Sequence, residues 1–171
     1  VLGYAGSLGT SIVRAFDTTL ALTGWTEKRL RQAGIAYAST VITAFDHASY
    51  YPDATPVTLK LTFCPTTGRV FGGQAVGVAG VDKRIDVVAT AISGGMTVDA
   101  LSQLQLCYAP PFGSARDVVN VAGLAARNSR DRLVHASTAM GEAALSGQRD
   151  VVLLDVRPRE SAELSPIAGS V

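Results

Sequence analysis

The strongest pattern of hydrophobic and polar positions lies in residues 57–63, which read Val-Thr-Leu-Lys-Leu-Thr-Phe. Apolar side chains at every second position are typical of a strand with one buried face. A Pro-Thr-Thr-Gly turn follows, and residues 69–78 return as a second strand. Glycines in that strand indicate a bulge or the close approach of another backbone; they are Gly72, Gly73 and Gly77. The pattern predicts a β-hairpin over residues 57–78.

Three further segments have a clear pattern. Residues 11–22 predict mostly strand, because their apolar residues lie among threonines. Residues 37–45 predict another strand, since they are rich in β-branched and aromatic residues. Residues 81–93 predict a helix, because their apolar residues fall on one helical face and two glycines follow. The first part of the chain therefore combines strands with helices.

Capping residues mark the starts of three other helices. Thr26 is expected to cap a helix over residues 27–33, which Gly34 ends. Thr97 is expected to cap a short helix that runs through residue 103. Ser114 is expected to open a helix to about residue 128, with Asp117 three residues on as in a capping box.

The pattern changes near residue 130. Residues 128–132 are polar and charged and predict a linker, and residues 135–145 are weakly helical. Residues 151–156 form a continuous apolar run, which is typical of a strand inside a parallel sheet. We therefore predict one domain over residues 1–128 and a different segment over residues 129–171.

Composition narrows the class of protein. The 171 residues are 47% hydrophobic and carry a formal net charge of +1, which excludes a disordered chain and argues against a nucleic-acid partner. No apolar run is long enough to cross a bilayer, so no membrane partner is expected. Cys64 and Cys107 are too few for a disulfide framework, and we expect reduced thiols in a cytoplasmic protein.

A search for common catalytic motifs gives little evidence of a function. The sequence has no Gly-x-Ser-x-Gly, no P-loop and no strand-linked Gly-x-Gly-x-x-Gly. His47 and His135, the two histidines, lack the clustered carboxylates of a zinc site, so no metal is expected. Cys64 and Cys107 lack a neighbouring base or cation that would activate a thiol, and we interpret both as structural.

Two proline-stiffened loops carry more information. Residues 46–52 contain Tyr50 and Tyr51, and residues 108–112 begin with Tyr108. Tyrosines of this kind either anchor a protein interface or place a phenol near a substrate as a hydrogen-bond donor or acid. The residues alone leave both interpretations open.

A set of short motifs points to one family. They are Gly9-Thr10, Phe16-Asp17, Thr23-Gly24, His47-Ala48, Tyr50-Tyr51-Pro52, Thr67-Gly68-Arg69, Gln74-Ala75-Val76-Gly77, Val81-Asp82-Lys83-Arg84-Ile85-Asp86 and Tyr108-Ala109-Pro110-Pro111-Phe112-Gly113-Ser114-Ala115-Arg116-Asp117. In order and spacing they resemble the C-terminal dimerisation domain of FAD-dependent pyridine nucleotide-disulfide oxidoreductases. Within that family they are most similar to the branch of coenzyme A-disulfide reductases and NADH oxidases. The resemblance covers about residues 6–126.

The resemblance implies an α+β fold, in which helices pack on an antiparallel sheet, and a homodimer. It also implies that Tyr50 and Tyr108 are active-site residues that reach the partner's flavin and reactive cysteine, with Tyr51 as the alternative to Tyr50. Arg116 stands where the family usually has a lysine that meets the phosphates of coenzyme A. The expected substrate is coenzyme A disulfide or a persulfide.

FAD and NAD(P)H are then expected in the intact enzyme, bound mainly by domains that precede this chain, with Tyr108 also near the flavin. Both ends of the chain look cut, so we expect no turnover from the chain alone. The alternative is a purely structural dimerisation module of an enzyme similar to NADH oxidase or peroxidase.

The tail has a resemblance of its own. Residues 152–157 (Val-Leu-Leu-Asp-Val-Arg) and the later Ile167-Ala168-Gly169-Ser170 resemble the opening of a rhodanese domain. The order Ser165-Pro166-Ile167 departs from the His-Ile-Pro usual there. We expect a truncated rhodanese-like segment without sulfurtransferase activity.

Overall fold

The computed structural model describes residues 6–131, 146, 152 and 154–171. The chain divides into two compact units, residues 1–133 and residues 134–171. The first unit contains one five-stranded sheet in the order β1-β2-β5-β4-β3, and every neighbouring pair is antiparallel. Its strands are β1 (Ser11–Ala15), β2 (Thr18–Gly24), β3 (Ala38–Phe45), β4 (Pro56–Phe63) and β5 (Val70–Gly77). The predicted α+β class is confirmed.

The segment predicted as mostly strand is a hairpin of two strands. β1 pairs with β2 across a turn at Phe16 and Asp17, with Ala15 opposite Thr18. Phe16 has a φ of 55°, a left-handed conformation that glycine or asparagine adopts more readily. The prediction of mostly strand is confirmed, but it did not include the turn, because Phe16 is not a residue type that usually marks a tight hairpin.

The predicted hairpin over residues 57–78 is confirmed as β4 and β5. The pairing shifts by one residue after Thr62, so that Phe71 is the extra residue of a β-bulge. Next to the bulge, the backbone of Trp25 crosses Gly72. A Cβ atom on Gly72 would lie 2.3 Å from the carbonyl oxygen of Trp25. The glycine signal therefore corresponds to both predicted features, a bulge and a close backbone approach.

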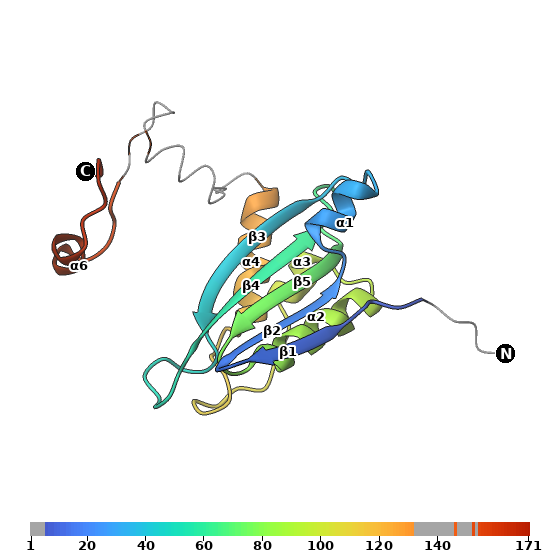
Figure 1. The fold of residues 1–171 in the computed structure, drawn as a ribbon, viewed down its shortest axis with the longest axis horizontal. Coiled ribbons are helices and arrows are strands. Elements are labelled where there is room, and N and C mark those ends of the chain that lie inside the picture. Colours follow the sequence, from blue (N-terminus) through green and yellow to red (C-terminus); the bar gives the residue numbers. More distant parts are fainter. Residues whose placement is uncertain (1–5, 132–145, 147–151, 153) are drawn as a thin grey trace. The chain divides into compact units, whose positions relative to one another are not determined.

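Helices cover one face of the sheet (Figure 1). They are α2 (Val81–Ser93), α3 (Val98–Ser102) and α4 (Val118–Arg130), while the short α1 (Glu27–Gln32) joins β2 to β3. The alternating side chains of β4 point into the core between the sheet and these helices, where Val57, Leu59, Leu61 and Phe63 are fully buried. The opposite face of the sheet leaves apolar side chains exposed; they include Val13, Leu20, Val41 and Val76.

The predicted helix starts hold except at α4, and α1 and α3 each end one residue before the predicted end. Thr26 and Thr97 cap α1 and α3 as predicted, and α2 runs over the predicted residues. α4 begins at Val118 rather than at Ser114, and its N-cap is Asp117. The Asp117 side chain accepts from Val119 N, while Asn120 Oδ1 accepts from Asp117 N and completes a capping box. The true capping box lies three residues beyond the predicted one.

The second unit is described over residues 154–171 and at two single positions. It contains α6 (Arg159–Leu164). The described members of the predicted strand over residues 151–156 are Val152 and residues 154–156, and none of them lies in a strand. Asp155 N donates to Val171 O at 3.0 Å, a backbone contact that does not extend into a strand among the described residues. The predicted helix over residues 135–145 lies outside the described residues.

Candidate functional site

Two loops meet at one end of the sheet (Figure 1). We define the Tyr50 loop as residues 46–55, between β3 and β4, and the Tyr108 loop as residues 103–117, between α3 and α4. Ala48 N donates to Pro110 O at 3.3 Å, which joins the loops through their backbones. The phenols of Tyr50 and Tyr108 also interact, and this interaction raises the pKa of Tyr50. Two tyrosines far apart in the sequence therefore share one site.

Both phenols are accessible. Tyr50 is 75% exposed and Tyr108 is 51% exposed. The hydrogen bond with Tyr108 raises the pKa of the Tyr50 phenol above its usual value, with smaller contributions from partial burial and from the charge of Tyr108. Like any phenol of ordinary or raised pKa, Tyr50 is protonated at neutral pH and can donate a hydrogen bond or a proton.

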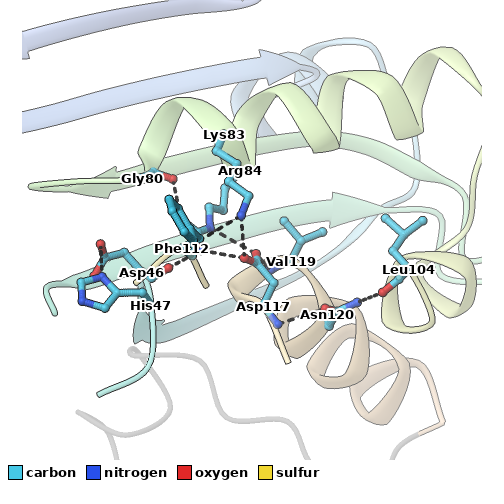
Figure 2. A network of polar contacts seen from close by, with 10 residues as sticks. All are labelled: Asp46, His47, Gly80, Lys83, Arg84, Leu104, Phe112, Asp117, Val119 and Asn120. Carbon is cyan, nitrogen blue, oxygen red and sulfur yellow. Dashed lines mark hydrogen bonds and ion pairs between the residues drawn. The ribbon is translucent and has the colours of Figure 1, made fainter. Parts of the chain in front are cut away.

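A buried guanidinium holds the base of this site together (Figure 2). Arg84 of α2 makes a bidentate pair with Asp117, from Nε to Oδ1 at 3.1 Å and from Nη2 to Oδ2 at 2.6 Å. It also donates to the carbonyl oxygens of Gly80 and Asp46. Arg84 is 2% exposed. One side chain thus ties α2 to the start of the Tyr50 loop and to the end of the Tyr108 loop.

Further bonds fix the Tyr108 loop. Asn120, beside the Asp117 cap of α4, donates from Nδ2 to the carbonyl oxygens of Leu101 and Leu104 at 3.1 and 3.0 Å. Lys83 Nζ donates to Phe112 O at 3.2 Å. Figure 2 shows the bond between Asn120 and Leu104 beside Asp117, at the start of α4. The Tyr108 loop is therefore held at its start, its middle and its end.

The Tyr50 loop has its own closure. His47 lies between the Asp46 carboxylate, 2.9 Å from Nδ1, and the Pro52 carbonyl oxygen, 3.0 Å from Nε2. Thr55 N donates to Asp46 Oδ1 at 2.6 Å. Tyr51 places its ring edge-on to His47, with the ring centroids 6.1 Å apart. Tyr51 thus packs inside its own loop, whereas Tyr50 meets Tyr108.

The remaining candidates lie at or near these loops. Arg116 is exposed, directly before the Asp117 cap, and forms no ion pair with a described residue. Cys107 is exposed beside Tyr108, and Cys64 directly follows β4, just before the turn. A hydrogen bond from the Thr67 side chain, with others from the backbone of Thr67 and Thr66, lowers the pKa of the Cys64 thiol.

The described residues show what this unit can hold. Among them, no group of three or more His, Cys, Asp or Glu side chains could bind a metal ion. All of the described strand pairs are antiparallel, so this part of the chain contains no βαβ unit of the kind that binds dinucleotides. No described helix has the length and apolar character needed to cross a bilayer. What the site presents is a pair of phenols.

Sequence reasoning missed the residues that hold the phenols in place. Asp46 was not singled out as a functional residue, the only chemical role considered for His47 was that of a metal ligand, and Arg84 was assigned no role. A signal for Arg84 was present, because it lies on the apolar face of α2, three residues after Val81 and four before Val88. A charged residue at a core position of an amphipathic helix indicates a buried partner.

Comparison with known proteins agrees with this architecture. Residues 10–119 match the family model described as "Pyridine nucleotide-disulphide oxidoreductase, dimerisation domain". Because the match covers more than half of the chain, the chain belongs to this family.

Particular relatives narrow the comparison. The chain is 36% identical over 124 residues to a coenzyme A disulfide reductase of Staphylococcus aureus, and 38% identical over 125 residues to that of Staphylococcus haemolyticus. These matches cover 72% and 73% of this chain but only 28% of each relative. The chain therefore spans less than a third of the length of these curated relatives.

Solved structures of similar fold also belong to longer reductases and oxidoreductases, of which this chain covers only a part. The reduced CoADR-RHD of Bacillus anthracis is 43% identical, with a TM-score of 0.87, over 98% of this chain and 30% of that one. The NAD-dependent persulfide reductase from A. fulgidus is 40% identical, with a TM-score of 0.82, over 91% of this chain and 28% of that one. An FAD-dependent pyridine nucleotide-disulphide oxidoreductase from Desulfovibrio vulgaris is 25% identical, with a TM-score of 0.57, over 75% of this chain and 28% of that one.

Proposed function

We propose that this chain is the dimerisation domain of an FAD- and NAD(P)H-dependent reductase, and that it completes the active site of a partner subunit with Tyr50 and Tyr108. The proposed substrate is coenzyme A disulfide or a persulfide. The observation that carries the proposal is the juxtaposition of two accessible phenols on two loops that a buried ion pair holds together. The names of the relatives, a coenzyme A disulfide reductase and a persulfide reductase, support the substrate class.

The chemistry that the phenols would perform follows from their protonation. When bound in the intact enzyme, FAD would supply the electrons that NAD(P)H provides for breaking a sulfur–sulfur bond. Cleavage of that bond releases a thiolate, whose negative charge a phenol stabilises by donating a hydrogen bond. A tyrosine phenol, whose pKa is ordinarily about 10, is a hydrogen-bond donor throughout the neutral range, and the raised pKa of Tyr50 keeps it so. Proton transfer to this thiolate would then give the free thiol product.

Two further roles belong to the same proposal. Arg116, exposed beside the site, would bind a phosphate of coenzyme A, which a guanidinium can contact through two nitrogens. The FAD and the nicotinamide nucleotide would be bound mainly by other parts of the enzyme, with Tyr108 near the flavin. For residues 129–171 we retain a linker followed by a rhodanese-like segment, supported by the Bacillus anthracis match over nearly the whole chain.

Substitution of each phenol in the full-length reductase tests the proposal. Tyr50→Phe and Tyr108→Phe should each lower kcat/KM for the disulfide by about tenfold or more, or ~1.4 kcal/mol of transition-state stabilisation, because a donor to the leaving thiolate is lost. Tyr37→Phe is the matched control, since Tyr37 lies just before β3, at the end of that strand away from the site. Unchanged kcat/KM in both site variants would favour a purely structural dimerisation module.

A further inference from the structure

The proposed function leaves a buried histidine of the site without a role. His47 is 8% exposed and lies between two acceptor groups, the Asp46 carboxylate and the Pro52 carbonyl oxygen. The two bonds connect the start of the Tyr50 loop to a residue beyond Tyr50. The imidazole therefore closes a ring of backbone that contains Tyr50.

Hydrogen-bond chemistry decides the charge of this imidazole. A carbonyl oxygen only accepts, so Nε2 must carry a hydrogen to bind Pro52. Burial alone would raise the pKa of Asp46, but the bonds from Thr55 N and from His47 outweigh it and lower that pKa. The ionised carboxylate also only accepts, so Nδ1 must carry a hydrogen too. Both bonds exist together only in the imidazolium form.

The two hydrogen bonds of His47, which we call the closure of the Tyr50 loop, are linked to the rest of the site. The carbonyl oxygen of Asp46 accepts from Arg84, and Arg84 holds Asp117 at the end of the Tyr108 loop. We propose that His47, as an imidazolium, is the positioning residue that holds Tyr50 against Tyr108. Its importance for catalysis rests on the proposed function of the two phenols, whereas the coupling between His47 and Tyr50 can be tested without it.

The charged groups around His47 set the direction of its pH dependence. The bond with Asp46 raises the pKa of His47 most, and the bond with Pro52 and the negative charges of Asp46 and Asp53 add to it, against a smaller lowering by burial. The Tyr51 ring contacts the imidazole edge-on, and Arg84 reaches only the carbonyl oxygen of Asp46. The closure is thus complete below the ordinary histidine pKa and is lost as pH rises through the higher folded value.

Nuclear magnetic resonance of the chain, labelled with ¹³C in tyrosine and histidine rings, tests the coupling. The His47 signal should titrate with a midpoint above the usual histidine pKa of about 6.5, and the Tyr50 ring signals should shift with the same midpoint. In His47→Gln that shift of Tyr50 should disappear. His135→Gln, which removes the chain's other histidine, is the matched control and should retain it.

The outcomes separate the inference from the proposed function. Two results would overturn the inference. One is a Tyr50 signal that does not shift as His47 titrates in the unmodified chain, and the other is a Tyr50 signal that still shifts in His47→Gln. The first of these readouts does not require a folded variant. In the full-length reductase, His47→Gln should lower kcat/KM by about tenfold or more relative to His135→Gln, as expected when a reacting group is misplaced. If Tyr50→Phe leaves kcat/KM unchanged while the coupling is observed, the proposed function alone fails.

Discussion

At the scale of single residues, the molecule depends on a few polar groups that each perform more than one task. Asp117 caps α4 and also pairs with Arg84, and Arg84 binds the loop that carries Tyr50. Ion pairs of this kind do not necessarily stabilise a fold relative to apolar residues, but removing one partner leaves the other charge buried. Their value here is that they specify where two loops lie.

Replacing Arg84 should therefore be costly. Arg84→Met leaves the buried Asp117 without its bidentate partner and should lower the free energy of unfolding by about 3–5 kcal/mol, measured by urea denaturation. Arg127→Met is the control, because the Arg127–Asp131 pair is half exposed and 3.9 Å long, and its loss should cost less than about 1 kcal/mol. Equal effects of the two substitutions would contradict the importance assigned to the buried pair.

At the scale of elements, local signals were sufficient where the structure itself is local. The alternation in β4, the helical face of α2 and the threonine caps of α1 and α3 were all predictable, because each depends on residues a few positions apart. The start of α4 was not. Ser114 and Asp117 are both good N-caps, and the choice between them involves Arg84, which lies on another helix.

In the candidate site, too, local features could be predicted from the sequence and long-range contacts could not. The two tyrosine loops could be singled out from their tyrosines and prolines, but their contact could not, because it depends on how β3, α2 and α4 come together. The turn at Phe16 and Asp17 was missed for a different reason, since it uses a positive φ at a phenylalanine. The proposed roles of Tyr50, Tyr108 and Arg116 stay predictions.

The bulge in the β4–β5 hairpin provides a test at this scale. Gly72→Ala would place a Cβ atom against the carbonyl oxygen of Trp25, a backbone atom that cannot easily move away. We expect a loss of about 1–3 kcal/mol in the free energy of unfolding, followed by circular dichroism in urea. Gly94→Ala is the matched control, because Gly94 has a φ of −79° and its added Cβ would meet no atom closer than 3.4 Å. A Gly72 variant as stable as the Gly94 variant would contradict the close approach.

At the scale of the whole molecule, the first unit buries one face of its sheet and leaves apolar side chains on the other. Val13 and Val41, which lie on this open face, are each more than half exposed. Contiguous apolar surfaces of this kind mark interaction sites in soluble proteins. A formal net charge of +1 puts little electrostatic repulsion between copies of the chain.

We accordingly expect the chain to form a homodimer, in agreement with its membership of a dimerisation-domain family. Light scattering after size-exclusion chromatography at micromolar concentration should give twice the mass of the chain. The monomer mass alone, at every concentration tested, would contradict the prediction. The measurement needs neither FAD nor the full-length enzyme.

The antiparallel hairpin of β4 and β5 also separates its two ends in space. β4 starts beside the Tyr50 loop and runs for 8 residues, or roughly 25 Å at 3.3 Å per residue, before the turn at residues 65–68. Thr66 and Thr67 at the tip of that turn are exposed. A peptide tag or fluorophore inserted between them would report on the protein, or immobilise it on a surface, from the end of the sheet opposite the phenols.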